Sequence, residues 1–111
     1  VYKKRNIISI FEPHRYSRVL SLKKDFAKSF SKSNLVLLCP IYAAGESRNP
    51  KFNHYEFAKL ISKFSKTQVI MIRNYKEIEK YLKKNLIDDE IIIGMGAGVI
   101  SKYMKELKTI L

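Results

Sequence analysis

The segment Ile7-Ile8-Ser9-Ile10-Phe11 is the first of four short apolar runs that decide the fold of this chain. The other runs span residues 35–39, 68–72 and 90–93. All four have the length of strands, are rich in Val, Ile or Leu, and lack polar alternation. This pattern is typical of strands that are covered on both faces of a sheet. The runs therefore predict four buried, parallel strands.

Each run is followed by apolar residues at helical spacing, which predicts four strand-then-helix units. The third helix also has a start signal, because Asn74 can cap its first turn while Glu77 reaches back to that residue. Repeated strand–helix alternation implies right-handed parallel crossovers. We therefore predict an α/β fold, with one doubly wound, mainly parallel sheet and helices on both faces. The apolar positions are Leu22, Phe26 and Phe30, then Phe57, Leu60, Ile61 and Phe64, then Ile78, Tyr81 and Leu82, then Ile100, Tyr103, Met104 and Leu107.

Length and composition indicate a single globular domain over residues 1–111. Hydrophobic residues make up 46% of the chain, which argues against disorder. No apolar run approaches the roughly 18 to 20 residues that cross a bilayer, and no signal peptide opens the sequence. We expect a soluble, cytoplasmic domain that does not contact a membrane. The single cysteine, Cys39, excludes an internal disulfide and fits a buried position better than a reactive one.

The net charge of +12 invites a role in nucleic-acid binding, but the placement of the lysines argues against it. The lysines recur between apolar positions of the predicted helices, as they do on solvated helix faces. Aromatic residues do not interleave with them to form a stacking platform for bases. We therefore expect no nucleic-acid partner. The lysines in question are Lys23, Lys24, Lys28 and Lys32, then Lys76, Lys80, Lys83 and Lys84, then Lys102, Lys105 and Lys108.

Chemistry-bearing residues follow the first predicted strand, at the edge of the sheet where such folds bind ligands. His14, Arg15 and Arg18 lie between this strand and a helix start that Ser17 could cap. An arginine fork and a helix N-terminus both suit carboxylate or phosphate. Each residue alone could be an ordinary solvated side chain, but the cluster favours an anion site.

Two further strand ends carry motifs of lower specificity. Residues 42–46 supply Tyr42, two alanines and a glycine that permit close approach to the backbone, and Glu46, whose carboxylate could receive an ammonium group. An ordinary surface turn explains this segment equally well. Glycines at alternate positions in residues 94–98 are typical of phosphate loops, with Gly96 and Ala97 as candidate cofactor contacts, and also of tight strand–helix packing. No cluster with metal-ligand spacing exists, so we expect no metal site in this chain.

Taken in order, these three strand ends resemble the third domain of UDP-N-acetylmuramate–L-alanine ligases, a branch of the Mur ligase family. Residues 42–46 and 94–98 are similar to the second and last motifs of that domain, and the resemblance extends over the whole chain. The most specific part, which separates this branch from its sister ligases, reads Pro13-His14-Arg15-Tyr16-Ser17-Arg18.

The resemblance implies a Rossmann-like Mur ligase C-terminal domain in an ATP-dependent carboxylate–amine ligase of peptidoglycan synthesis. In that family ATP phosphorylates the UDP-N-acetylmuramate carboxylate, and the amine of L-alanine attacks the acyl phosphate. The third domain closes over a central ATPase domain and contributes to the amino-acid site. His14 would then be the catalytic residue, orienting substrate or relaying a proton. Arg15, Arg18, Tyr42 and Glu46 would bind substrate.

Some features of the family pattern are different or absent here. Glu12 and Val99 stand where the family usually has Gln and commonly has Asp. The ATP-binding lysine, the Mg²⁺ ligands and the UDP-binding domain are not in this sequence. We therefore expect a fragment of the enzyme that is inactive alone, with ATP and Mg²⁺ bound mainly by the remaining domains of the same chain. A stand-alone module for small anions, or a basic nucleic-acid-binding domain, are the alternatives.

Overall fold

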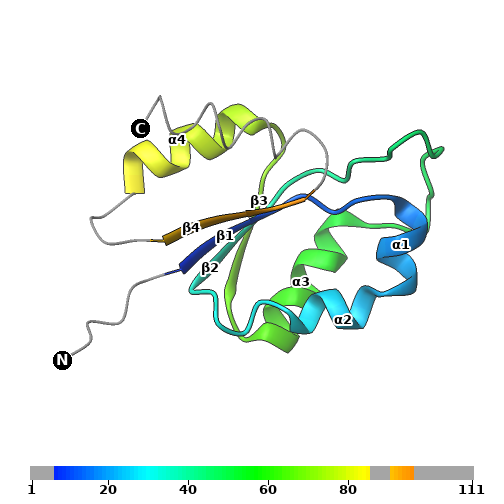
Figure 1. Ribbon diagram of the computed structural model, residues 1–111, viewed down its shortest axis with the longest axis horizontal. Coiled ribbons are helices and arrows are strands. Elements are labelled where there is room, and N and C mark those ends of the chain that lie inside the picture. The colour runs from blue at the N-terminus through cyan, green and yellow to red at the C-terminus, as the bar shows by residue number, and fades with distance from the viewer. Residues whose placement is uncertain (1–6, 86–90, 97–111) are drawn as a thin grey trace.

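A computed structural model describes residues 7–85 and 91–96 of the chain. Strands and helices alternate along it, as Figure 1 shows. The elements are β1 (Ile7–Phe11), α1 (Tyr16–Ser21), α2 (Lys23–Lys28), β2 (Leu35–Leu38), α3 (His54–Ser65), β3 (Gln68–Met71), α4 (Tyr75–Asn85) and β4 (Ile91–Met95).

The four strands form one parallel sheet in the order β3-β2-β1-β4. The chain winds from β1 to β3 in one direction and then returns to place β4 on the other side of β1. Helices α1, α2 and α3 cover one face of the sheet and α4 covers the other (Figure 1). This is the doubly wound α/β architecture that the sequence predicts. In such sheets the strand order reverses beside the first strand, and ligands bind at the carboxyl ends there.

Alternate residues of the central strands supply two separate hydrophobic cores. Ile8 and Ile10 of β1 pack with Ile78 and Leu82 of α4 on one face. Phe11 lies in the core on the other face, which is formed with α1, α2 and α3. Cys39 is fully buried on the α4 face, where burial and the charge of Glu12 raise the pKa of its thiol to about 12. The thiol is therefore protonated at neutral pH, which confirms the core interpretation of this cysteine.

The structure corrects several predicted boundaries. β2 and β3 end one residue earlier than predicted, and β4 starts at Ile91 and extends to Met95. Full coverage on both faces is confirmed for β2 but is wrong for β3 and β4, because each has a neighbouring strand on one side only among the described residues. The helix predicted after β4 lies outside the described residues.

The single helix predicted after β1 is two short helices that meet at Leu22. The backbone N–H of Leu22 donates to the carbonyl of Arg18 at the end of α1, and the carbonyl of Leu22 accepts from Phe26 in α2. The Leu22 side chain is 40% exposed, so it does not belong to the predicted apolar stripe. The break allows Val19 of α1 and Ala27 of α2 both to be buried in the same core.

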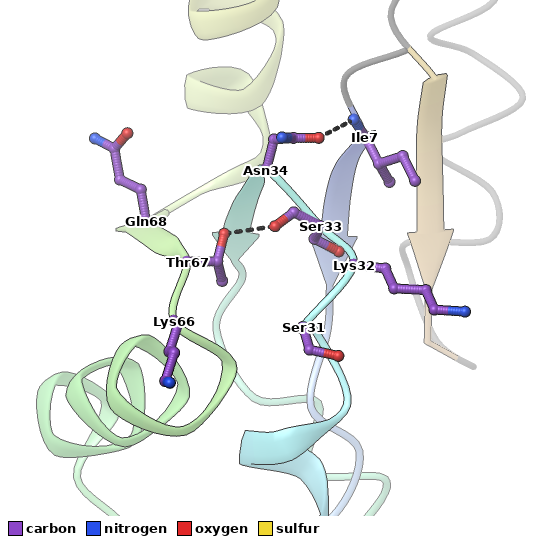
Figure 2. Close-up of a pocket in the computed structure, with 8 residues that line it drawn as sticks. All are labelled: Ile7, Ser31, Lys32, Ser33, Asn34, Lys66, Thr67 and Gln68. Carbon is purple, nitrogen blue, oxygen red and sulfur yellow. Dashed lines mark hydrogen bonds between the residues drawn. The ribbon is translucent and has the colours of Figure 1, made fainter. Parts of the chain in front are cut away.

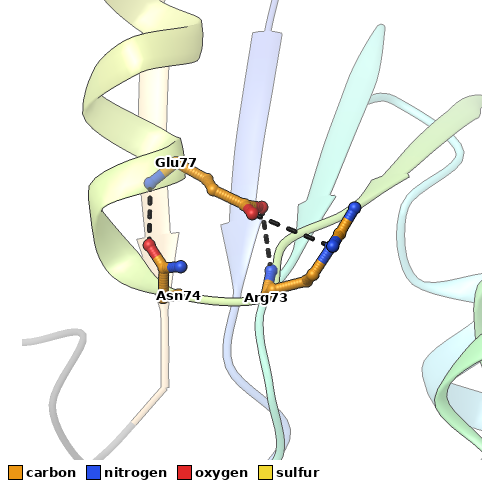
Figure 3. A network of polar contacts seen from close by, with 3 residues as sticks. All are labelled: Arg73, Asn74 and Glu77. Atoms are coloured by element: carbon orange, nitrogen blue, oxygen red, sulfur yellow. Dashed lines mark hydrogen bonds and ion pairs between the residues drawn. The ribbon is translucent and has the colours of Figure 1, made fainter.

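Asparagine caps begin the two longest described helices. In α3, the Asn53 side chain accepts from the backbone N–H of Glu56 at 3.0 Å. In α4, Asn74 accepts from Glu77 N–H at 3.2 Å, as predicted (Figure 3). The Glu77 carboxylate, however, accepts from the N–H of Arg73 at 3.0 Å and not from Asn74. It therefore satisfies a donor one residue before the cap.

Ser65, the last residue of α3, connects this helix to the end of α2 by hydrogen bonds. Its hydroxyl donates to the carbonyl of Ala27 and accepts from the backbone N–H of Phe30 at 3.1 Å. Ser65 is only 2% exposed, so both bonds are shielded from water. Such bonds are expensive to lose, because the partners are left unpaired in the interior.

Ser65→Ala should therefore lower the free energy of unfolding by about 1–3 kcal/mol, since it leaves the buried Phe30 N–H without its acceptor. Urea denaturation of the 111-residue chain measures this change. Ser62→Ala, at an exposed serine one turn earlier on the same helix, should stay within about 0.5 kcal/mol of wild type. Equal effects from the two substitutions would contradict this account of Ser65.

Candidate functional site at the carboxyl edge of the sheet

The loops that follow β1 and β2 are joined by backbone pairing beyond the sheet. The N–H of Tyr42 donates to the carbonyl of Pro13, and the N–H of Arg15 donates to the carbonyl of Tyr42, both at 2.8 Å. These bonds form an isolated parallel bridge between His14 and Tyr42. The two rings stack, with centroids 5.5 Å apart and planes 20° from parallel. Three of the predicted site residues, His14, Arg15 and Tyr42, are thus brought together.

Glu46 joins the same cluster through the start of α1. One carboxylate oxygen accepts from the Ser17 hydroxyl at 2.5 Å, and the other accepts from the Ser17 backbone N–H at 3.2 Å. Ser17 was predicted to cap α1, but the helix begins at Tyr16 and the residue before it makes no side-chain cap bond. Glu46 instead satisfies an N–H of the first turn from another loop. The physical reason is that a carboxylate is favoured beside the unpaired N–H groups of a helix start.

Hydrogen bonds from Ser17 hold the pKa of the Glu46 carboxyl below its ordinary value, and the nearby charge of Arg15 adds to the effect. Glu46 is therefore an anion at neutral pH. Both carboxylate oxygens of Glu46 already accept hydrogen bonds from Ser17 at the start of α1. An ammonium group that bound Glu46 would therefore contact oxygens that keep these bonds.

Arg15 has an unusual backbone conformation, with φ 66° and ψ 131°. Residues other than glycine rarely adopt positive φ, and each such residue costs about 1–3 kcal/mol. The bonds of its N–H to Tyr42 and of its carbonyl to Val19 hold this conformation in place. Strain of this kind is concentrated at functional sites. The Arg15 and Arg18 side chains are both exposed, and no carboxylate within residues 7–85 and 91–96 lies within 4.0 Å of either guanidinium.

The turn at Ala44 and Gly45 brings Glu46 back toward α1. Both residues have positive φ, 53° and 88° respectively. A Cβ atom at Gly45 would meet no atom within 4 Å, so glycine is needed there for its backbone angle and the turn remains open to approach.

The end of β4 lies against the end of β1. Phe11 pairs with Met95, and the N–H of the next residue, Glu12, donates to the Met95 carbonyl at 2.8 Å. This register places Gly96 at the same edge as the loop that carries His14. The other predicted cofactor contact, Ala97, lies outside the described residues.

His54 is a neighbour of this edge that the sequence did not single out as a site residue. It begins α3, and its ring centroid lies 6.4 Å from that of Phe52. Its Nε2 atom is buried and has no hydrogen-bond partner in the described part of the chain. Burial lowers the pKa of His54, and the nearby carbonyls of Cys39 and Leu38 only partly offset this. Its position could not be inferred from spacing, since His14 and His54 are far apart in sequence.

A hollow of about 630 Å³ lies at the opposite, amino-terminal edge of the sheet (Figure 2). Its polar groups are largely engaged with one another: Asn34 accepts from the N–H of Ile7, and Thr67 donates to the carbonyl of Ser33. The side chains of Lys32 and Lys66 point in different directions (Figure 2). Among the described residues that line it, this hollow therefore lacks the convergent groups of a binding site.

No group of three or more His, Cys, Asp or Glu side chains gathers within residues 7–85 and 91–96. In the same ranges, no helix is both long enough and apolar enough to cross a membrane.

No family model matches the chain, but the chain is similar to several curated proteins. The chain is 44% identical over 106 residues to the UDP-N-acetylmuramate–L-alanine ligase of Pelagibacter ubique, covering 96% of this chain and 23% of that protein. It is 35% identical to the ligases of the same name from Prochlorococcus marinus and Caldanaerobacter subterraneus, covering 93% and 96% of this chain. Those alignments cover 21% and 24% of the two relatives. The chain thus spans less than a quarter of the length of these relatives.

The doubly wound parallel sheet defines a Rossmann-like α/β domain, and the relatives that the chain matches are all ligases. More specifically, the chain belongs to the UDP-N-acetylmuramate–L-alanine ligases of the Mur ligase family and corresponds to their C-terminal domain.

The contacts of Glu46 predict how its titration responds to mutation. Because its folded-state pKa is depressed, the carboxylate stabilises the fold above about pH 4.5, its ordinary pKa, and this contribution is lost as the pH falls through the lower folded value. Ser17→Ala should move the pKa of Glu46 up toward 4.5, since the hydroxyl donor is gone. A carbon-13 NMR titration of the Glu46 carboxyl measures the shift. Ser21→Ala, at the exposed far end of α1, should leave it unchanged, and a Glu46 pKa that ignores both substitutions would refute the Ser17 contact.

The strain at Arg15 predicts that glycine is the better residue for stability at this position. Arg15→Gly should raise the free energy of unfolding by about 1 kcal/mol, because relief of the positive φ outweighs the flexibility of glycine in the unfolded chain. Arg15→Ala should give no such gain, since alanine keeps the Cβ atom. Arg18→Gly, inside α1, should destabilise by about 1 kcal/mol. Urea denaturation of the three variants measures the pattern, and a loss of stability in Arg15→Gly as large as that in Arg18→Gly would rule out strain at Arg15.

Proposed function

We propose that this domain supplies the amino-acid site of an ATP-dependent ligase that joins L-alanine to UDP-N-acetylmuramate in peptidoglycan synthesis. The observation that carries the proposal is the joining of the β1 and β2 loops, which gathers His14, Arg15, Tyr42 and Glu46 at one edge of the sheet. Family membership supports the same reaction, since the named activity of the relatives is this ligation. The full-length ligase, of which this domain would be one part, would contain further domains.

The proposed reaction has two steps. ATP phosphorylates the carboxylate of UDP-N-acetylmuramate, releasing ADP and forming an acyl phosphate. The amine of L-alanine then attacks the acyl carbon, and the new amide bond forms as phosphate leaves. Charge accumulates on the oxygens of the tetrahedral intermediate, where positioned donors lower the barrier most.

The exposed arginines are suited to this charge. Arg15 and Arg18 would contact the alanine carboxylate and the acyl phosphate, because a guanidinium fork can hold two oxygens at once. His14, held against Tyr42, would orient the attacking amine or relay its proton. Tyr42 and Glu46 would form the adjoining wall, with Glu46 also holding the start of α1 through Ser17.

ATP and Mg²⁺ chemistry would belong mainly to the other domains. No carboxylate cluster of the described residues could ligate Mg²⁺, and Gly96 at the end of β4 supplies only backbone to a nucleotide phosphate. The domain would act by closing over the bound nucleotide and bringing the amino-acid site to the acyl phosphate. We therefore propose a cytoplasmic enzyme in which this domain is inactive by itself.

Arg18→Ala in the full-length ligase tests the proposal. Loss of a charge-assisted contact in a closed site should cost about 2–4 kcal/mol of transition-state stabilisation, or roughly 30- to 1,000-fold in kcat/KM for L-alanine. Arg18→Lys should recover only part of this loss, because an ammonium group cannot make a two-pronged contact. Phosphate release that depends on both UDP-N-acetylmuramate and L-alanine measures the activity.

Two controls accompany this measurement. Lys24→Ala removes an exposed charge from the neighbouring helix α2 and should leave kcat/KM unchanged. The isolated 111-residue chain should release no phosphate. Arg18→Ala with wild-type kcat/KM, or with a loss that merely follows its thermal melt, would show that Arg18 is only a surface charge. A full-length protein that does not ligate L-alanine would refute the function itself.

A further inference from the structure

Glu12 is a charged residue buried at the centre of the carboxyl edge. It directly follows β1 and is 1% exposed. Continuing the strand register by one residue places Glu12 in a row with Cys39, Ile72 and Gly96. Backbone bonds extend the pairing into this row, since Glu12 donates to Met95 and Cys39 donates to Phe11. A buried carboxyl here needs a compensating partner, because desolvation of a charge is costly.

Tyr75 provides that partner from across the fold. It is the first residue of α4, and its hydroxyl donates a hydrogen bond to one carboxyl oxygen of Glu12. The bond joins positions 63 residues apart in sequence. It ties the end of β1 to the start of the helix that covers the opposite face from α1 and α3. Burial and the neighbouring Glu12 carboxyl raise the pKa of Tyr75, so its hydroxyl keeps the proton that it donates.

The hydrogen bond between Glu12 and Tyr75 lies next to the candidate site. Glu12 precedes Pro13, whose carbonyl accepts from Tyr42, and lies two residues before His14. The backbone of Glu12 is fixed to β4 by its bond to Met95. The side-chain bond to Tyr75 therefore holds this peptide from the α4 face, while the Tyr42 bridge holds it from the β2 side.

We propose that Glu12 is a positioning residue: its carboxyl, held by the Tyr75 hydroxyl, sets the place of the His14–Tyr42 stack over the carboxyl edge. The effect on catalysis rests on the function proposed above, but the effect on the stack does not. Glu12 reaches no substrate, because it is buried, and acts through the loop that it anchors. A displacement of a catalytic group by about 1 Å can cost roughly 100-fold in rate, which gives such an anchor its importance.

Paired substitutions separate positioning from simple stabilisation. Tyr75→Phe should lower the thermal midpoint of the 111-residue chain by about 5 °C, because the carboxyl loses a donor. The double variant Glu12→Met/Tyr75→Phe removes both members of this hydrogen bond together and should recover most of that midpoint, since neither the carboxyl nor the hydroxyl then loses the other while it stays buried. Glu12→Gln keeps an acceptor for the hydroxyl. Tyr55→Phe, at an exposed tyrosine of α3, is the matched control for loss of a hydroxyl.

Two measurements test the proposal: one reports on the His14–Tyr42 stack and the other on the rate of ligation. The first is the nuclear Overhauser effect between the His14 and Tyr42 rings in the 111-residue chain. It should fall at least about twofold in the double variant and persist in Glu12→Gln and Tyr55→Phe. The second is kcat for L-alanine in the full-length ligase, which should fall about 10- to 100-fold in the double variant with a smaller change in KM. Glu12→Gln should recover most of this activity.

A double variant that recovers its thermal midpoint and also keeps the contact between the His14 and Tyr42 rings would overturn the proposal. The hydrogen bond between Glu12 and Tyr75 would then only stabilise the fold. The same holds if kcat returns together with stability. If the ring contact is lost while the wild-type full-length protein does not ligate L-alanine, the positioning inference stands and the proposed function fails. The positioning role of Glu12 and the proposed ligase function are therefore refuted by different measurements.

Discussion

Parallel pairing of β1 on both of its sides is the constraint on which the rest of the structure depends. β1 pairs with β2 along one edge and with β4 along the other, so three carboxyl ends meet at one place. Because Phe11 is level with both Leu38 and Met95, the loops that leave these strands start side by side. The His14–Tyr42 bridge and the contact of Glu12 with Met95 are direct extensions of that register. A shift of β1 by one residue would exchange its two faces and separate these loops.

Much of this fold could be predicted because buried parallel strands leave a strong signal in sequence. The run over residues 7–11 coincides with β1, and the start of β2 at Leu35 is also as predicted. The features that were missed depend on tertiary packing. No glycine or proline marks the break between α1 and α2 at Leu22 in the sequence. The break follows from the burial of Val19 and Ala27 in one core. The exposure of β3 depends on its edge position, which hydrophobicity alone does not reveal.

The candidate site was predictable in its residue types but not in its internal partners. His14, Arg15, Tyr42 and Glu46 stand at strand ends, where the fold makes them neighbours. The partner of Glu46 is 29 residues away, and the partner of Glu12 is 63 residues away. No local pattern links such positions, because a side chain that crosses between loops obeys no helical or strand period. The positive φ of Arg15 could not be predicted for a related reason. The bond to Tyr42 imposes this backbone angle, which arginine does not favour by itself.

The contact between Glu46 and the start of α1 changes how an anion would be recognised at this edge. α1 has six residues, and the N–H of Ser17 in its first turn already serves the protein's own carboxylate. A substrate carboxylate arriving there would meet a negative charge, so the helix start cannot be the main source of attraction. In the proposed function, the attraction would come from the exposed guanidinium groups of Arg15 and Arg18. Glu46 would then have two effects, since it would repel an anion from the helix start while its bonds to Ser17 hold the short helix that carries Arg18. Such an arrangement would direct a substrate carboxylate toward the arginines and leave the negative side of the cluster to an amine.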